Sequence, residues 1–531
     1  MARRLTDILG QPVSPPTVRF IGGDGVPPGT WTRHWHYPLP VTPLYADFEF
    51  GAHLSISNVV GSEEHLKITS LFPSRHDRRT SFLVVDGYAY SMGNRKEVAN
   101  PDAPDPAQAD PFDRSGYEYV IWRRWVEEVR PQAAEDLRRF RAADLPILTD
   151  RALLDHIRAL SLYMVEHWAQ IHCPGPAFKL IRLRCELFCE RHLGLSGAQF
   201  LDLFNGLSET TSGPVRAMEE VAATVRRDPA LLAALDTADP WADPGIGDVL
   251  ADYVEIYGHK ATDWEYVTPT LAERPQRIVA LLRDAVARLE QGKAGASEEV
   301  HRRRRALEAS LRERLPDDET RRRFDALLRD AQDTFGIHED HINLYNLGEG
   351  YMRYALLEAG RRFAARGLLS GRERVFFLRR PELETLLDGQ PVAGLRVAGL
   401  RVAGLPVAEL ADARWRTYEA HKQHKPPQTI AGGTSHKKPG AEHAAAETAS
   451  AAVANGALSL ANGVLAPGDE VRGVGASPGT YEGVVRVVFT EDQFEDVRAG
   501  EVLVSPQTTP SWTILFGKIG ALVTNDGGML S

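Results

Sequence analysis

A stretch of small and polar residues between positions 425 and 468 divides this 531-residue chain into two unequal parts. The stretch is rich in Pro, Gly, Ala, Ser and Thr and contains few large apolar side chains. Such a segment buries too little apolar surface to offset the entropy that is lost when a backbone becomes ordered. The sequence therefore predicts a flexible linker over residues 425–468, with separately folded domains before and after it.

The long part before the linker shows mainly helical periodicity, from about residue 115 to residue 365. In one such segment apolar side chains recur at helical spacing, at Leu153, Ile157, Leu160 and Met164. Asp150 precedes them and is a residue type that caps helix N-termini. Residues 1–114 instead contain many prolines and glycines and a strand–turn–strand pattern around an Asp-Gly pair. We expect an irregular, extended segment over 1–114 and a mainly helical domain over 115–424.

After the linker the pattern changes to short strands separated by turns. The strands are expected at residues 471–474, 483–489, 501–505 and 521–523. The last strand runs into a Thr-Asn-Asp-Gly-Gly turn close to Ser531. A β/α unit normally continues into a helix that covers its sheet, so we expect the domain over 469–531 to be truncated. The predicted fold class is a multidomain α+β protein, with a large, mainly α-helical domain followed by a truncated β/β/α domain.

Composition argues against several classes of protein. The formal net charge of −10 opposes a general nucleic-acid binder, which needs a basic surface. No apolar run approaches the roughly 20 residues that cross a bilayer, and the N-terminus lacks the apolar core of a signal peptide. Three cysteines favour a reducing compartment, so we expect a cytoplasmic protein without membrane or nucleic-acid partners. Cys185 and Cys189 are expected to be small buried side chains, and we predict no metal site.

Three motifs follow one another after the linker, at residues 476–488, 502–512 and 522–531. They include Ala-Ser-Pro-Gly, then Val-Leu-Val-Ser-Pro-Gln-Thr-Thr-Pro-Ser-Trp, then Thr-Asn-Asp-Gly-Gly-Met-Leu-Ser. In this order they resemble the swivelling phosphohistidine (mobile) domain of the phosphoenolpyruvate (PEP)-utilising enzymes, such as PEP synthase. In that family Gly-Gly-Met-Leu-Ser is followed at once by the phosphorylated histidine. The resemblance therefore implies that the phosphohistidine lies beyond Ser531.

A thinner resemblance extends upstream. Residues 257–260 read Tyr-Gly-His-Lys, and they are followed by Glu265, Pro269, Glu273 and Pro275. This is similar to a Gly-His-Arg-Gly…Glu…Pro…Glu-x-Pro pattern in the helical substrate domain of the rifampin phosphotransferases. Here Lys260 and Ala261 replace Arg-Gly, which puts the role of that arginine in doubt. Residues 351–363 and 375–378 resemble the same family.

The resemblance implies a phosphotransferase component that moves a phosphoryl group from ATP or PEP, through a phosphohistidine, to a small organic acceptor. The linker would let the mobile domain visit two sites at high effective concentration. No stretch resembles an ATP-grasp domain, so no cofactor is expected in this chain, and ATP and Mg²⁺ are expected on a separate ATP-grasp subunit, as in phenylphosphate synthase. A non-catalytic binding or regulatory protein, or an inactive fragment, is the alternative, because no residue of the chain occupies the phosphorylated position.

Several residues are candidates for the site. His259 suits acid–base chemistry on an acceptor hydroxyl, because imidazole titrates near neutral pH, although a structural histidine is equally compatible with the pattern. Lys260 and Arg353 are expected to contact the substrate. His34 and His36, set among aromatic residues, would line an acceptor pocket or simply pack. Loop hydroxyls and backbone N–H groups would face the phosphate, unless these loops are only structural turns, at Thr508, Thr509, Ser511, Gly527, Gly528 and Ser531.

Overall fold

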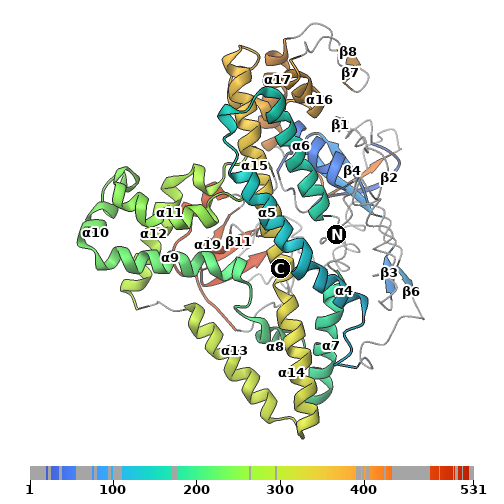
Figure 1. The fold of residues 1–531 in the computed structure, drawn as a ribbon, viewed down its shortest axis with the longest axis vertical. Coiled ribbons are helices and arrows are strands. Elements are labelled where there is room, and N and C mark those ends of the chain that lie inside the picture. The colour runs from blue at the N-terminus through green and yellow to red at the C-terminus, as the bar shows by residue number, and fades with distance from the viewer. Residues whose placement is uncertain are drawn as a thin grey trace. The chain divides into compact units, whose positions relative to one another are not determined.

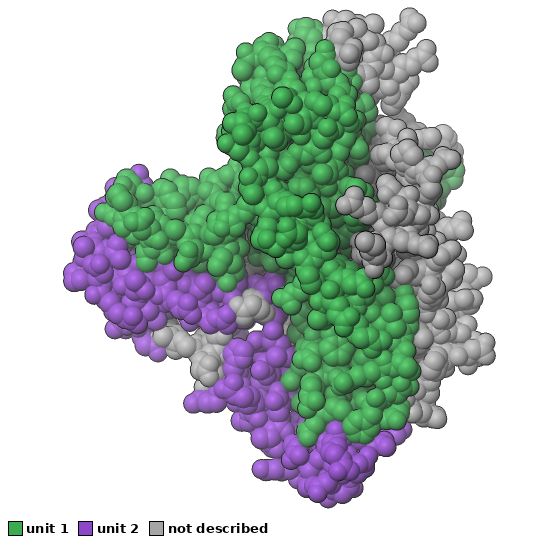
Figure 2. Space-filling model, viewed as in Figure 1, with its two compact units in different colours: residues 1–185, 241–278, 325–433 green, residues 186–240, 279–324, 434–531 purple. Residues whose placement is uncertain are grey.

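The protein divides into two compact units, each formed from three separate stretches of chain (Figure 2). Unit 1 comprises residues 1–185, 241–278 and 325–433, and unit 2 comprises residues 186–240, 279–324 and 434–531. Two stretches of the predicted helical domain thus group with the C-terminal residues, which differs from the boundaries expected at 114, 424 and 468. The computed structural model describes the following residues: 20–21, 26–34, 37, 39–54, 74–76, 80–93, 97–99, 110–168, 176–261, 265–292, 296–389, 396–397, 400–401, 406–423, 426–432, 479–488, 491–505, 508, 512–516 and 518–524.

The helices of unit 1 pack around one long helix, α15 (Ile337–Ala365). Helices α5 (Arg130–Arg141) and α6 (Asp150–His167) both pack against it, as Figure 1 shows. The apolar stripe predicted on α6 is buried in the same core, which confirms that helix. The other helices whose residues all belong to this unit are α2 (Pro43–Ala46), η2 (Asp47–Leu54), α4 (Tyr117–Arg124), η4 (Trp125–Val129), η5 (Leu145–Ile147), α11 (Pro244–Tyr257), η9 (Leu271–Glu273), η10 (Arg372–Phe377), α16 (Arg380–Leu387) and α17 (Val407–Lys422).

Helix α15 has no face that is open to solvent along most of its length. Every residue from position 345 to position 360 is buried or half-buried. Neighbouring elements that pack on it include α5, α6 and η10. A helix that is covered all round lacks the polar stripe of a surface helix, so its central place in the fold cannot be read from an amphipathic pattern.

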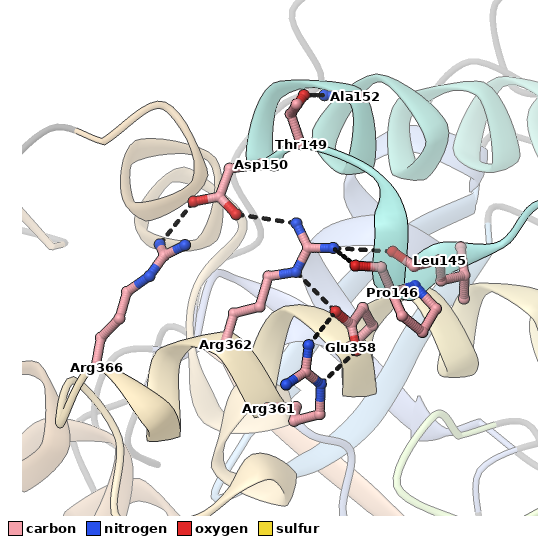
Figure 3. A network of polar contacts seen from close by, with 9 residues as sticks. All are labelled: Leu145, Pro146, Thr149, Asp150, Ala152, Glu358, Arg361, Arg362 and Arg366. Atoms are coloured by element: carbon pink, nitrogen blue, oxygen red, sulfur yellow. Dashed lines mark hydrogen bonds and ion pairs between the residues drawn. The ribbon is translucent and has the colours of Figure 1, made fainter.

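A network of charged side chains joins the end of α15 to the segment that leads into α6 (Figure 3). The buried Arg362 guanidinium donates to Glu358 on its own helix at 2.7 Å and to Asp150 at 3.0 Å. It also donates to the carbonyl oxygen of Leu145 at 2.8 Å. Arg366 pairs with the second oxygen of Asp150 at 2.6 Å. Because each charge has an opposite charge or a carbonyl group beside it, the network can be buried without a large desolvation penalty.

The N-terminus of α6 differs by one residue from the sequence prediction. Thr149, not Asp150, is the capping residue, and its hydroxyl accepts the N–H of Ala152 at 3.1 Å. Asp150 is the first helical residue, and its carboxylate pairs with Arg362 of α15 and with Arg366, which directly follows that helix. Both residue types favour helix starts, so only the tertiary partners distinguish them.

A five-stranded sheet forms the other part of unit 1, with the strand order β1-β4-β5-β2-β9. The strands β4 and β5 form the hairpin that the sequence predicted. Asp86 and Gly87 at its turn both have positive φ, at 49° and 82°, as a two-residue hairpin loop of this kind requires. The strands of this sheet are β1 (Phe20–Ile21), β2 (Gly29–Arg33), β4 (Thr80–Val85), β5 (Tyr88–Gly93) and β9 (Thr429–Gly432). Two small antiparallel pairs are β3 (Ser74–His76) with β6 (Glu97–Ala99), and β7 (Arg396–Val397) with β8 (Leu400–Arg401).

Strand β9 lies inside the segment that was predicted to be linker. It pairs antiparallel with β2, from Thr429 opposite Thr32 to Gly432 opposite Gly29. The ordered part of unit 1 therefore extends beyond position 425, where the linker was expected to begin. Residues 433–468 of that prediction lie outside the described residues.

A buried ion pair holds the π-helical segment η2 against the start of α16. The Asp47 carboxylate accepts hydrogen bonds from Nε and Nη2 of Arg379, both at 2.6 Å. It also accepts the backbone N–H of Arg380 at 2.9 Å. Both side chains of the pair are less than a tenth exposed, so each charge depends on the other for its stability.

Unit 2 contains further helices and a three-stranded parallel sheet. The strands β10 (Val485–Val487), β11 (Val502–Ser505) and β12 (Ala521–Thr524) confirm three of the expected strands, and the fourth, 471–474, lies outside the described residues. Leu503 packs on one side of the sheet with Phe494 and Trp512. The helices wholly within unit 2 are α8 (Gly197–Leu201), η7 (Asp202–Phe204), α9 (Glu209–Arg227), α10 (Pro229–Leu235), α13 (Ala296–Glu313), η11 (Glu491–Asp496) and α19 (Thr513–Phe516). Helices α7 (Pro176–Leu193), α12 (Pro275–Glu290) and α14 (Asp318–Phe335) contribute residues to both units, and η8 (Pro240–Ala242) lies at a border.

The coarse fold prediction is confirmed, since a large helical part is accompanied by a small β-containing part. Cys185 and Cys189 are both fully buried, as expected. None of the helices in the described part of the chain has the length and apolarity that crossing a membrane requires. Within the same residues, no group of three or more His, Cys, Asp and Glu side chains is arranged as a metal site.

Candidate functional site

His259 lies in unit 1, two residues after the end of α11, and it is half-buried against α15. Its ring is flanked by Tyr351 and Tyr354, with centroid distances of 6.5 and 5.9 Å. The backbone of this loop touches α15 closely, because a Cβ atom at Gly350 would lie 1.9 Å from the His259 carbonyl oxygen. The N–H of Ala261 donates to the carbonyl oxygen of Asn346 at 2.8 Å. Glycine at position 350 thus permits the approach that places the histidine between the two tyrosines.

A chain of hydrogen bonds leads from His259 to a buried ion pair. Nδ1 of His259 is 3.1 Å from the Tyr354 hydroxyl, which is 2.8 Å from Oγ1 of Thr270. Thr270 donates to the Glu273 carboxylate through Oγ1 at 3.1 Å and through its N–H at 2.9 Å. Glu273 in turn receives Nε and Nη2 of Arg353 at 2.8 and 2.9 Å. The five residues form one continuous path between η9 and α15.

The ionised Glu273 carboxylate determines which atom donates in each hydrogen bond of this path. Burial alone would raise the pKa of Glu273, but the hydrogen bonds and charge of Arg353, with those of Thr270, hold that pKa below its usual value. A carboxylate only accepts, so the Thr270 hydroxyl must donate to it and must accept from Tyr354. The Tyr354 oxygen then accepts the Nδ1 proton of His259. The network thereby assigns the tautomer with the proton on Nδ1, which leaves the Nε2 lone pair available to accept a proton.

The charge state of His259 also leaves the ring able to accept a proton. Partial burial, together with the positive charge of Arg141, lowers the pKa of His259 below its ordinary value. The ring is therefore neutral near pH 7 and can act as a base. Burial raises the pKa of Tyr354 to about 12, so its hydroxyl keeps the proton that it donates to Thr270.

Lys260 follows His259 in the sequence, and Arg353 is linked to it through the hydrogen-bonded path, but both side chains are buried. Lys260 reaches toward α15, where Nζ is 3.4 Å from Oδ1 of Asn343. Arg353 uses Nε and Nη2 on Glu273 and donates Nη1 to the Tyr266 carbonyl oxygen at 2.6 Å. Its side chain is only 6% exposed. The geometry therefore makes Arg353 a partner of Glu273 rather than a group that faces an acceptor in this structure.

His34 lies in an aromatic environment that the sequence anticipated. Its ring is 5.3 Å from the rings of Tyr37 and Phe82. Burial lowers the pKa of His34 to about 4, against a smaller opposing effect of Glu49. This arrangement fits the packing alternative for His34. His36 lies outside the described residues, so its role stays a prediction.

A cluster of buried glutamates and tyrosines lies in the same core and was not found from the sequence. Glu49 accepts from the Tyr345 hydroxyl at 2.6 Å, and Glu349 accepts from the Tyr45 hydroxyl at 3.4 Å. Glu265 accepts the N–H and the hydroxyl of Thr42, both at 2.7 Å. The partners come from segments 223 to 304 residues apart, so no local pattern connects them. The available signal was a carboxylate between aromatic neighbours, as in Phe-Glu-Phe at 48–50 and Trp-Glu-Tyr at 264–266.

Only part of the predicted phosphate-facing loops can be placed. Thr508 is half-buried and follows β11 by three residues. Thr509, Ser511, Gly527, Gly528 and Ser531 lie outside the described residues. Their assignment to a phosphate site stays a prediction.

Comparison with known proteins identifies relatives of two separate stretches. The family described as "Rifampicin phosphotransferase fourth domain" matches residues 178–339, which include His259, and "PEP-utilising enzyme, mobile domain" matches residues 497–531. A rifampicin phosphotransferase of a Streptomyces species is 29% identical over 293 residues, which are 54% of this chain and 30% of that protein. A probable phosphoenolpyruvate synthase of Archaeoglobus fulgidus is 41% identical over 59 residues, or 11% of this chain and 8% of that protein. One of Staphylothermus marinus is 44% identical over 63 residues, or 12% and 8%.

These matches cover at most 30% of the length of the relatives given above. They nevertheless occur in the order that the motifs predicted, with the substrate-domain match before the mobile-domain match. The family inferred from the sequence is thereby confirmed. Residues 178–339 and 497–531 of this chain are thus similar to domains of the rifampicin phosphotransferases and of the PEP-utilising enzymes, among them the phosphoenolpyruvate synthases.

Proposed function

We propose that this chain is the acceptor-binding component of a PEP-utilising phosphotransferase, in which His259 is the general base toward the acceptor. The acceptor is a small organic molecule with a hydroxyl group. The donor is the phosphohistidine of the mobile domain, for which the resemblance gives the position directly after Ser531. An ATP-grasp subunit, with ATP and Mg²⁺, would charge that histidine.

The proposed step balances in atoms and charge. The acceptor oxygen forms a bond to phosphorus while the bond between phosphorus and the histidine nitrogen of the mobile domain breaks. That nitrogen keeps the electron pair of the broken bond and takes up a proton from solvent, which balances the proton that His259 later releases. The hydroxyl proton passes to Nε2 of His259, which then returns it to solvent. The Nδ1 proton stays on the path to Tyr354 throughout, so the imidazolium that forms is stabilised by a hydrogen bond of fixed direction.

The observation that carries this proposal is the path from Glu273 to His259. A structural histidine needs only to be buried and satisfied. Here a carboxylate, two hydroxyl groups and an imidazole are aligned so that one ring nitrogen is committed and the other is left as an acceptor. Among the described residues, none forms a hydrogen bond with Nε2 of His259. This pattern, in which a third group orients a base, is the one that general-base sites share.

The test uses the chain extended beyond Ser531 by the histidine of the mobile domain, an ATP-grasp partner, ³²P-labelled ATP or PEP, and a fractionated pool of small hydroxyl compounds. Acid-labile, base-stable label on the protein reports the phosphohistidine, and label in the small-molecule fraction reports transfer. His259→Gln should keep the protein label and lose transfer by about 10²–10⁴-fold, which is the usual contribution of general acid–base catalysis. His156→Gln is the matched control, because His156 is also a partly buried histidine of unit 1 whose pKa is lowered by burial.

Two results would contradict the proposal. Transfer by His259→Gln at the rate of the unchanged protein would remove His259 from the chemistry. Absence of protein label with either donor would leave the alternative, a binding protein that keeps the helical site without phosphotransfer.

A further inference from the structure

A surface hollow lies at the last turn of α5 in unit 1. Its volume is about 560 Å³, and the described residues that line it are Glu135, Arg138, Arg139, Arg141 and Ala142. This volume falls within the range of about 300–1,000 Å³ that is typical of small-molecule sites. Three arginines and one glutamate of α5 line the hollow, and the arginines have the acidic partners Glu135, Asp136 and Glu255.

The arginines of the hollow are held only loosely by acidic partners. Arg138 pairs with Glu135 and Arg139 pairs with Asp136, each one turn earlier on the same helix. Their side chains are 72% and 63% exposed, so these pairs contribute little to stability and can exchange for another anion. A guanidinium has five N–H donors in a planar fork. One carboxylate cannot use all of them, and donors are left for a ligand with carboxylate or phosphate oxygens.

Arg141 connects the hollow to the helix that precedes His259. Arg141 lines the hollow and forms an ion pair with Glu255, four residues before His259. Burial lowers the pKa of His259, and the positive charge of Arg141 lowers it further. Burial raises the pKa of Tyr351, and the charge of Arg141 opposes that effect. The basic end of α5 therefore acts electrostatically on His259, the candidate base.

A simpler account covers only part of these observations. Basic residues in the last turn of a helix are favoured by the helix dipole, and α5 carries three of them. The dipole explains their presence on that turn. It does not explain a hollow of ligand size between them, or an arginine that reaches the α11 segment next to His259.

We propose that this hollow is an anion subsite, which binds a carboxylate or phosphate group of the acceptor while the hydroxyl of the same molecule faces His259. The acceptor would thus be an anionic hydroxy compound rather than a neutral one. The part of this proposal that concerns the acceptor rests on the proposed function. Anion binding at the hollow does not depend on it.

Binding is measured on the full chain by equilibrium dialysis with ³²P-labelled inorganic phosphate, with acetate as a competing carboxylate, at constant ionic strength to separate site binding from screening. We expect saturable binding that the double variant Arg138→Gln/Arg139→Gln weakens about tenfold or more, because two charge-assisted contacts are lost. Arg322→Gln/Arg323→Gln is the matched control, since these neighbouring arginines also pair along their own helix and are also exposed. It should bind phosphate as the unchanged chain does.

The outcome separates this inference from the proposed function. His259→Gln should retain phosphate binding, even though it should lose transfer. Saturable binding that is lost only in the Arg138/Arg139 variant supports the subsite, even if no transfer is ever observed. Binding that does not saturate, or that the control variant weakens equally, overturns the subsite, even if transfer through His259 is intact.

Discussion

Replacing Glu273 by Gln should destabilise unit 1 by about 3 kcal/mol, at the lower end of the range of about 3–5 kcal/mol for breaking a buried ion pair. The carboxylate accepts from Arg353 at 2.8 and 2.9 Å and from Thr270 at 2.9 and 3.1 Å. An amide of the same size keeps only one acceptor oxygen, so one arm of the buried Arg353 loses its partner. The lower end applies because the Glu273 side chain is 23% exposed and water can reach part of the site.

The same substitution should flatten the acid side of the stability curve. The folded-state pKa of Glu273 lies below the ordinary glutamate value of 4.5, because Arg353 and Thr270 outweigh the effect of burial. A carboxyl of this kind stabilises the fold at pH values above its unfolded pKa, and this contribution is lost as the pH falls through the folded pKa. Stability of the unchanged protein should therefore decline below about pH 4.5 more steeply than that of the variant.

Urea denaturation followed by tryptophan fluorescence would measure both effects. Of the nine tryptophans, only Trp512 belongs to unit 2, so the signal reports mainly on unit 1. Asp155→Asn is the control, because Asp155 also contacts two arginines of unit 1, but on an exposed helix face, and it should leave the transition unchanged. Equal shifts of the urea midpoint in the two variants would show that burial does not set the strength of the Glu273 pair.

Three further predictions follow from other contacts. Gly350→Ala should destabilise unit 1 by about 1–3 kcal/mol and change the pKa of His259 measured by NMR, because the added Cβ would meet the His259 carbonyl oxygen, whereas Gly336→Ala meets no atom within 4 Å. Asp47→Asn should lower the urea midpoint about as much as Glu273→Gln, because it leaves the Arg379 guanidinium buried, while Asp155→Asn in the exposed pair with Arg151 should not. Hydrogen bonds from Arg486 and from the Arg498 N–H lower the pKa of Glu501 to about 2, so its contribution to unit 2 should persist above pH 4.5 and disappear as the pH falls toward 2. Acid unfolding followed by deuterium uptake in β10 and β11 should therefore be less steep in Glu501→Gln, and identical curves would argue against this pair.

Local sequence patterns were enough to predict two elements of unit 1. The stripe from Leu153 to Met164 gave α6, and the Asp-Gly pair at 86–87 gave the β4–β5 hairpin, because both signals depend on neighbours within a few residues. The cap of α6 was misplaced by one residue, since Thr149 and Asp150 both suit a helix start. Strand β9 was missed because its pairing with β2 joins residues about 400 positions apart, and such pairing leaves no local trace.

The site was predicted in part. His259 was identified from a family pattern, and the structure adds a reason for its chemistry. Tyr354 and Thr270, which orient it, are 95 and 11 residues away and carry no motif of their own. Arg353 was expected to face a substrate, but its three donor nitrogens are used by Glu273 and Tyr266 inside the protein. The sequence indicated the residue types of the site. The packing of α15 determines which of these side chains a substrate can contact.

The burial of α15 between positions 345 and 360 determines how unit 1 opens. A helix with one solvent face can fray or detach while the rest of a domain stays folded. From position 345 to position 360 α15 has no such face, so its amide protons can meet water only when the surrounding elements separate. Deuterium uptake along this helix would therefore report the opening of the whole unit. The loop that carries His259 packs against Gly350 and would share that slow exchange.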